Sequence, residues 1–219
     1  MTDTTGDYNN FSSEVNAEVD LRRYEQGYNT IPANSVAKKT WIEWKNGPIN
    51  YQCNPISKEQ HDKWKSENTF KNGYAVIAGQ LWHGGNADLY GIWLDFDNFE
   101  AVKKYFGSWD KVLELAKTRR IEWHQEPAKL HYPLKIRRPI TNRNLPIGIE
   151  IRAENELVYC GQNKDLNYWV PIYSHETWIM EEDELLELLK FIEEQSGGKG
   201  LSTREERNDP NHFKREDTN

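Results

Sequence analysis

Residues 89–98 form an apolar run that ends in two carboxylates, and this run limits the fold more than any other stretch of the chain. Its sequence, LYGIWLDFDN, predicts a β-strand, in which alternate side chains point to the same face of a sheet. Asp95 and Asp97 are therefore expected on one face, while Leu94 and Phe96 point into a core. Two carboxylates at the end of a strand suit a hard divalent cation such as Mg²⁺, which prefers oxygen ligands. The alternative is that Asp97 caps the following helix and Asp95 only ends the strand.

The composition predicts a folded protein with an aromatic core. The 219 residues include 9 Trp, 11 Tyr and 7 Phe, enough for one large domain or two small ones that share a core. No apolar run is long enough to span a bilayer, and the first residues lack the pattern of a signal peptide. Cys53 and Cys160 lie far apart without a Cys/His cluster, which argues against a disulfide framework and a structural zinc site. We expect a soluble, cytoplasmic protein.

The charge is unevenly distributed along the chain. The formal net charge is -7, which does not fit a protein that coats nucleic acid in bulk. Residues 117–143 nevertheless contain many lysines and arginines and only two acidic residues, Glu122 and Glu126. Such a local basic stretch predicts a groove for a polyanion. The alternative is a solvated basic face without a ligand.

Hydrophobic spacing and turn signals predict alternating helices and strands. Predicted helices cover residues 14–26, a segment capped by Ser57 and Gln60, and residues 99–105, 109–119 and 181–194. Predicted strands cover residues 28–32, 74–78, 89–98, 121–124, 130–134, 147–152, 157–160 and 168–173. Pro133 favours the edge or end of a strand, because proline cannot donate to a sheet ladder.

Both ends of the chain are expected to lie outside one folded domain of residues 14–195. Residues 1–13 are rich in Thr, Asp and Asn and have little to bury, so we expect them to be disordered. Residues 196–219 are dominated by Gly, Ser and charged residues, which is typical of a flexible tail or linker. The domain is thus expected to belong to a longer protein.

Two predicted strands downstream carry further candidates for the site. His131 lies in the first of them, and its alternative role is that of a hydrogen-bonded residue of the sheet. Glu150 lies in the second, on the face that its apolar neighbours leave free; its alternative is an ordinary surface carboxylate paired with Arg152. His124 competes with His131, because it also lies on a predicted strand.

At IWLDFDN (92–98), KLHY (129–132) and IEI (149–151), the chain resembles the archaeo-eukaryotic primase superfamily. More narrowly, it is similar to the bifunctional primase-polymerase domain found in replication proteins of plasmids, viruses and integrated elements. The stretch upstream adds to the likeness through Lys39, Trp44 and the run GYAVIAG at 73–79. The resemblance covers residues 28–191 and rests on the order and spacing of these motifs.

The resemblance implies an α/β (α+β) fold in two parts, an N-terminal αβ unit and an RRM-like antiparallel sheet, with the active site between them. It implies a DNA primase and polymerase that uses Mg²⁺ or Mn²⁺ for template-directed nucleotidyl transfer to a 3′-hydroxyl. Asp95, Asp97 and Glu150 would be the catalytic metal ligands, and His131 would contact the phosphates of the nucleotide. The implied partners are a single-stranded DNA template, a primer and dNTP or NTP. A helicase domain or protein beyond the tail is a further candidate, and no membrane is expected.

Four basic residues are expected to complete the nucleotide site, because they would neutralise triphosphate or template phosphates: Lys129, Lys135, Arg137 and Arg138. The chain departs from the family at Lys129, where the family has a small hydroxyl residue. It also has GQN at 161–163 where the family tends toward Pro-Ser. Two cysteines cannot form the zinc-binding element that primase relatives often add.

Two other functions fit the same residues. A metal-dependent nuclease would use Asp95 or Asp97 with EIR at 150–152, in imitation of a D…E-x-K arrangement. This fit is poorer, because arginine does not lose its proton and cannot act as a base. A non-catalytic nucleotide- or DNA-binding module is the third hypothesis, and the presence of all three acidic residues argues against it.

Overall fold

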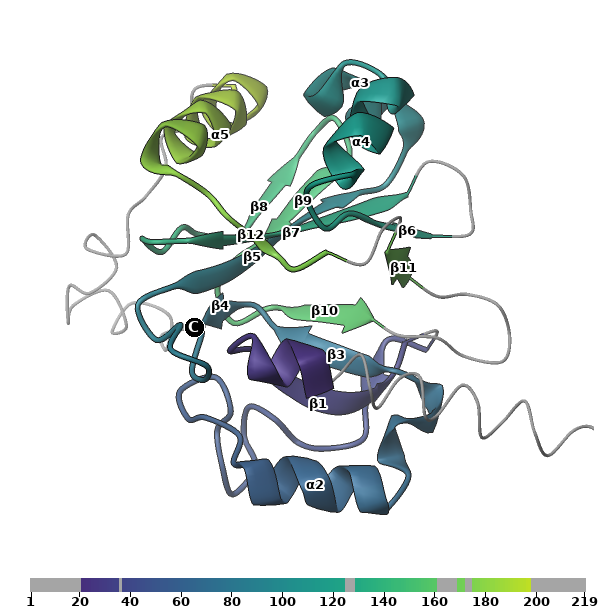
Figure 1. Ribbon diagram of the computed structural model, residues 1–219, viewed down its shortest axis with the longest axis vertical. Helices are drawn as coiled ribbons and strands as arrows, with labels where there is room; N and C mark the ends of the chain where they lie inside the picture. The colour runs from purple at the N-terminus through teal and green to yellow at the C-terminus, as the bar shows by residue number, and fades with distance from the viewer. Residues whose placement is uncertain (1–20, 36, 125–128, 161–168, 172–174, 198–219) are drawn as a thin grey trace, which may run out of the picture.

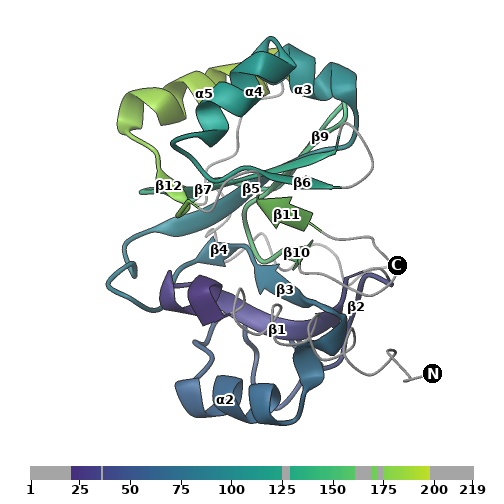
Figure 2. The same ribbon diagram turned by 45° about the vertical axis from the view of Figure 1, so that its right-hand side comes forward.

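The computed structural model describes residues 21–35, 37–124, 129–160, 169–171 and 175–197. Two β-sheets lie one above the other, and helices cover the outer face of each (Figure 1). Helices α3, α4 and α5 lie above the upper sheet, whereas α2 lies below the lower sheet (Figures 1 and 2). The protein is therefore a mixed α+β fold, as the sequence predicts.

The upper sheet has eight strands. Its main path runs through β11 (Trp169–Pro171), β6 (Glu122–His124), β7 (Leu130–Ile136), β5 (Tyr90–Phe96), β9 (Ile149–Arg152) and β8 (Arg143–Leu145). Two short strands pair beside this path, β4 (Gly79–Gln80) with β5 and β12 (Trp178–Ile179) with β7. The pairing is antiparallel throughout, except that β12 is parallel to β7.

The lower sheet has four strands, and one of them comes from the second half of the chain. The strand order is β10 (Leu157–Cys160), β3 (Tyr74–Ile77), β1 (Asn29–Asn34) and β2 (Lys39–Thr40). All three pairings are antiparallel. Because β10 completes this sheet, the N-terminal unit is not a contiguous piece of sequence.

The helices largely follow the predicted ranges. They are α2 (Lys58–Ser66), η1 (Thr69–Asn72), α3 (Phe99–Phe106), α4 (Trp109–Ala116) and α5 (Glu182–Gln195), and residues 21–25 are also helical. The Ser57 side chain accepts the backbone N–H of Gln60, which confirms the predicted start of α2. Helix α5 buries Leu185, Leu188 and Ile192, so its apolar side faces the core as predicted.

The side chains of β5 separate two cores. Ile92, Leu94 and Phe96 pack in the upper core, together with residues of α3, α4 and α5. Trp93 faces the other way and packs in the lower core, where its ring centroid lies 5.1 Å from that of Tyr28. This arrangement confirms the alternation that the sequence predicts for β5.

Pro133 lies in the middle of β7, so the expectation of a strand edge or end is wrong. The register places Pro133 opposite Trp93 on one side. On the other side, β6 pairs with β7 only as far as His131, and β12 begins its pairing at Leu134. Neither of these pairings includes Pro133, so the missing N–H interrupts no described ladder on that side.

The predicted termini fall mainly outside the described part of the chain. Residues 1–20 and 198–219 are not described, so the expected disorder of residues 1–13 and nearly all of the expected tail cannot be compared with the structure. Among the described residues, no helix has both the length and the apolar character that crossing a membrane requires.

Asn98, not Asp97, caps α3. The Asn98 side chain accepts the backbone N–H of Ala101 at 2.8 Å, and its backbone is extended, as is usual for a cap. The alternative role of Asp97 as a helix cap is therefore wrong, and its carboxylate is available for another interaction.

We expect Asn98→Ala to lower the free energy of unfolding by about 1 kcal/mol, because α3 loses its capping bond. Asp97→Ala should cause no such loss, since that side chain does not cap α3 and lies near another carboxylate. Urea unfolding of both variants would test this. A loss for Asp97→Ala as large as that for Asn98→Ala would contradict the assignment of the cap.

Candidate functional site

Five strands of the upper sheet place polar side chains in one row across its lower face. From β6 to β8, the successive partners in the register are Glu122, His131, Asp95, Glu150 and Asn144. Directly opposite residues on antiparallel strands point to the same face, with Cβ atoms about 4.5–5.5 Å apart. The face is that of Trp93, which packs in the lower core, so the row points toward the lower sheet. Asp95, His131 and Glu150, which the sequence places in one site, therefore share a face.

Asp97 extends this row toward solvent. Its backbone N–H donates to the Gly148 carbonyl at 3.0 Å, so the chain stays beside the β9 end for one more residue. Burial, together with the negative charge of Asp95, raises the pKa of Asp97. Side-chain exposure increases along the row, from 3% for His131 and 21% for Asp95 to 30% for Glu150. Asp97 is exposed, and the two neighbouring aspartates repel each other at the open end of the row.

His131 lies between two carboxylates. Its Nε2 atom is 3.6 Å from Oδ1 of Asp95, and its Nδ1 atom is 3.8 Å from Oε2 of Glu122. Burial alone would lower the pKa of His131, but the two carboxylates outweigh burial and raise that pKa well above its usual value. Burial alone would also raise the pKa of Asp95, yet His131, helped by Arg152 and Lys38, brings it below its usual value. Both shifts favour the form in which His131 is an imidazolium and Asp95 is a carboxylate.

Two arginines fix Glu122 at the buried end of the row. The Arg120 Nε atom donates to Oε1 of Glu122 at 2.7 Å, and Arg23 also donates to this oxygen. Arg23 donates its other terminal nitrogen to the Thr177 hydroxyl at 2.8 Å. Burial would raise the pKa of Glu122, but the two guanidinium groups and His131 hold it well below its usual range. This end of the site is thus a closed network of buried charges.

Sequence reasoning missed this network. Arg23 belongs to the predicted first helix, 99 residues from its partner, and no local pattern links the two. In the sequence, Arg120 and Glu122 stand out only as members of the basic stretch at 117–143. The single local signal was the alternation of residues 121–124, which puts Glu122 on the face opposite Ile121.

At the outer end, Glu150 is ion-paired with Arg152 of the same strand. Arg152 also lies 3.5 Å from Glu156. The sequence left this pairing open as an alternative role for Glu150, and the structure contains it. The position of Glu150 opposite Asp95 is independent of that pairing, because the register fixes it.

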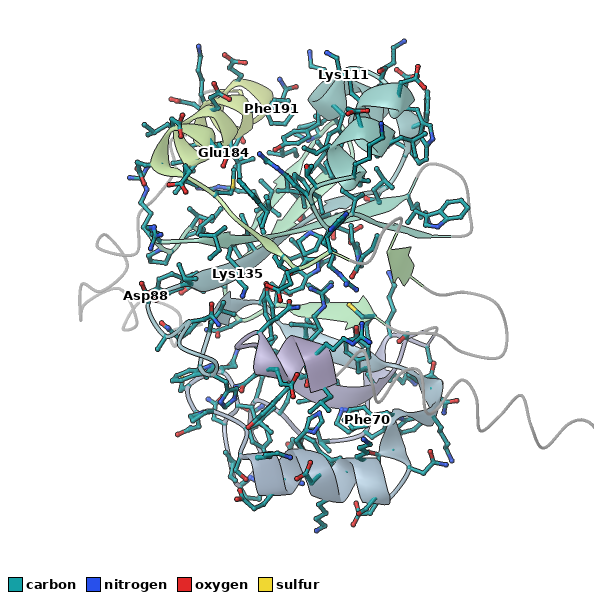
Figure 3. The ribbon with its side chains drawn as sticks, in the orientation of Figure 1. Phe70, Asp88, Lys111, Lys135, Glu184 and Phe191 are labelled. Carbon is teal, nitrogen blue, oxygen red and sulfur yellow. The ribbon has the colours of Figure 1, made fainter. Side chains whose placement is uncertain are left out.

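The structure separates the four predicted phosphate-binding residues. Lys129 precedes β7 next to the site, where its charge opposes the rise in the pKa of Asp97. Lys135 lies on the same face but about 13 Å along the strand from His131. It is buried between the sheets (Figure 3), where its ammonium group donates to the Gln26 carbonyl at 3.0 Å.

Arg137 and Arg138 lie beyond the other end of β7, about 20 Å along the chain from His131. Arg137 faces Asp88 at 3.8 Å, and Arg138 faces Glu182 at 3.0 Å. Figure 3 shows Asp88 at the end of the upper sheet where β5 begins, whereas the acidic row lies at the end of β5. These two arginines and Lys135 are therefore not part of the acidic site.

Cys160 brings a sulfur atom to the buried end of the row. Glu122, His131 and Cys160 each offer one ligand atom, these atoms lie within 4.8 Å of one another, and the group could hold a metal ion. The sequence argued against such a group because it has no local Cys/His cluster, and the pairing of β10 with β3 creates one. Burial raises the pKa of the Cys160 thiol, and Arg23 and Arg120 already neutralise Glu122, so both effects oppose a cation here.

No protein-family model matches the chain, and the search of curated proteins finds no match either. Functional assignment therefore depends on the chemistry of the site.

We expect Glu122→Gln to lower the free energy of unfolding by about 3–5 kcal/mol, because Arg23, Arg120 and His131 would keep buried positive charge without its counter-charge. Urea unfolding at neutral pH would measure this. Asp62→Asn is the control, since it breaks the exposed ion pair with Lys58 and should have no measurable effect. Equal stability of the parent and Glu122→Gln would contradict the network.

The stabilisation from His131 should depend on pH. Its pKa is raised on folding from about 6.5 in the unfolded chain. The contribution is therefore fully present below about pH 6.5 and is lost as pH rises through the folded pKa. The stability difference between the parent and His131→Gln, measured by urea unfolding from about pH 5 to about pH 9, should shrink with increasing pH. A difference that does not vary with pH would show that folding leaves the pKa of His131 unchanged, and one that grows as pH rises toward about 6.5 would show that folding keeps His131 uncharged; either result would contradict the raised pKa.

Proposed function

We propose that the protein is a template-directed nucleotidyltransferase of the primase-polymerase type, which adds nucleotides to a DNA 3′-hydroxyl. The observation that carries this proposal is the register that sets Asp95 directly opposite Glu150, with Asp97 beside Asp95 at the open end of the row. Glu150, from a distant part of the chain, thus lies opposite Asp95 on one sheet face, and Asp97 follows Asp95 just beyond the end of β5. The position of that face toward a second, mainly N-terminal sheet supports the finer assignment to a primase-type fold.

The donor set suits Mg²⁺ or Mn²⁺. Carboxylate oxygens are the ligands that these hard cations prefer, and the repulsion between Asp95 and Asp97 is relieved when a cation lies between them. Asp95, Asp97 and Glu150 would hold the ions, and Glu150 would exchange its contact with Arg152 for them. Bound cations about 3.5–4 Å apart supply charge neutralisation for the attacking and leaving oxygens of an in-line displacement.

The residues around the three carboxylates have separate proposed roles. His131 is only 2% exposed, and both its nitrogens face carboxylates, which favours a role in orienting Asp95 over direct contact with phosphate. Lys129 and Lys38 are therefore better candidates than His131 for the predicted contact with phosphate, because their charges act on Asp97. Arg152 is a further cation beside the acidic row.

The nuclease and binding-module alternatives use the same acidic residues. The nuclease is the poorer fit, because the basic residue after Glu150 is Arg152, which is paired with that carboxylate and cannot act as a base. A module that only binds nucleotides or DNA would bind them with metal and leave a primer unchanged. The products of one reaction separate all three functions.

The test is an incubation of primed DNA template with dNTPs and Mg²⁺ or Mn²⁺. The parent should lengthen the primer, and Asp95→Ala and Asp97→Ala should each lower the rate at least about a hundredfold while keeping the fold. Asp88→Asn is a matched control at the other end of β5 and should retain full activity. A shortened primer would favour the nuclease. Binding of nucleotides without extension of the primer would favour the non-catalytic binding module. Full extension by the Asp95→Ala/Asp97→Ala double variant would rule out the site.

A further inference from the structure

The end of β1 lies near the buried end of the acidic row, across β3 and β10. The register sets Pro32 of β1 opposite Tyr74 of β3, and Tyr74 opposite Cys160 of β10. The Cys160 sulfur lies within 4.8 Å of a ring nitrogen of His131. Just after β1, the Ser35 hydroxyl donates to the Cys160 carbonyl. The hydrogen bond from Ser35 thus holds the chain after β1 against the last residue of β10, and β2 follows at this end of the lower sheet (Figure 2).

Lys38 adds an exposed positive charge to this segment. It lies three residues after Ser35, whose hydroxyl contacts the Cys160 carbonyl, and it directly precedes β2, where Lys39 pairs with Asn34 of β1. Its φ of 49° lies in the left-handed region, which favours glycine over a branched or long side chain. The backbone of Lys38 therefore has a conformation that glycine would adopt with less strain.

Trp41 adds a half-exposed aromatic ring to this segment. Its backbone N–H donates to the Pro32 carbonyl at 3.2 Å. Trp41 is therefore held beside Pro32, which is in line with Tyr74 and Cys160 across the lower sheet. Its side chain is 52% exposed, so it contributes little to either core. Lys39 and Lys45 are exposed on either side of it in sequence.

We propose that Trp41, with Lys38, Lys39 and Lys45, forms a platform that binds single-stranded nucleic acid and leads it to the acidic row. The Trp41 ring would stack on a base, which tolerates any sequence because every base has an aromatic face. The lysines would neutralise phosphates of the same strand. The inference rests on the proposed function, and it adds where the template or primer strand meets the protein.

Charge supports a nucleic acid as the occupant over an apolar protein segment. Three lysines and one acidic residue, Glu43, lie in residues 37–45, although the whole chain has a net charge of -7. Lys38 and Lys39 come just before the exposed ring of Trp41 in sequence, and the ammonium group of Lys45 lies over the Trp44 ring, 4.7 Å from its centroid. Cations close to an exposed ring in this way match a strand in which phosphates and bases alternate. An apolar peptide would require a wider apolar surface than one ring.

The test is the binding of a fluorescently labelled single-stranded oligonucleotide to the full chain, followed by anisotropy without added nucleotides. Trp41→Ala should weaken binding at least about fivefold, and Trp41→Phe should restore most of it, because phenylalanine keeps a stacking face. Trp123→Ala is the matched control. Trp123 is also exposed, at 38%, but it pairs with Leu130 on the face of β6 away from the row, so binding should not change.

The lysines are tested by salt dependence and by a strand without bases. Lys39→Ala should lower the slope of log affinity against log salt by about 0.7. Lys38→Gly should weaken binding without loss of stability, because glycine suits the backbone there. Trp41→Ala should not alter binding of an abasic oligonucleotide of equal length, since that strand offers nothing to stack on.

The outcomes separate this proposal from the proposed function. Unchanged binding by Trp41→Ala, or no binding by the parent, overturns the platform even if primer extension is normal. Weaker binding by Trp41→Ala, with rescue by Trp41→Phe, supports the platform even if the parent fails to extend a primer. An equal effect of Trp41→Ala on the abasic strand overturns the stacking role.

Discussion

The buried ion network around Glu122 is the interaction on which the rest of the structure depends. Burial of a charge is costly unless each charge has a partner, and here Arg23 and Arg120 bind one oxygen of Glu122 while His131 faces the other. Arg23 comes from the N-terminal helical segment and Glu122 from the upper sheet, so the network also joins the two halves of the fold. Lys135 makes a second such link through the Gln26 carbonyl.

The network gives the acidic row two ends with different chemistry. At the closed end, Arg23 and Arg120 share one oxygen of Glu122, and His131 lies between the carboxylates of Glu122 and Asp95. At the open end, Asp95 and Asp97 repel each other, and the cations that act on Asp97 are Lys129, Lys38 and Arg152. A bound metal cation would neutralise the two aspartates at this end, and a polyanionic substrate would neutralise the cationic side chains around them. The proposed catalysis and the proposed platform at Trp41 both use this asymmetry.

The basic stretch shows how far charge counting from sequence can go. It indicated correctly that cations gather in this part of the chain, but not which of them reach the acidic residues. Lys129 does, because it directly precedes the strand that carries His131. Lys135 lies farther along the same strand and Arg137 just beyond its end, and each residue adds about 3.3 Å of separation, so their charges make other contacts.

The sequence by itself determined the features that depend on local periodicity. The sequence predicted that the side chains of Asp95 and Leu94 point to opposite faces of the sheet and that Ser57 caps α2. Both predictions depend on a few adjacent residues, because strand alternation and helix capping are local properties. Only the tertiary structure decided which strands are neighbours. It brought Cys160 to His131 and joined Arg23 to Glu122, because pairing between strands and segments far apart in the chain leaves no periodic signal in either of them.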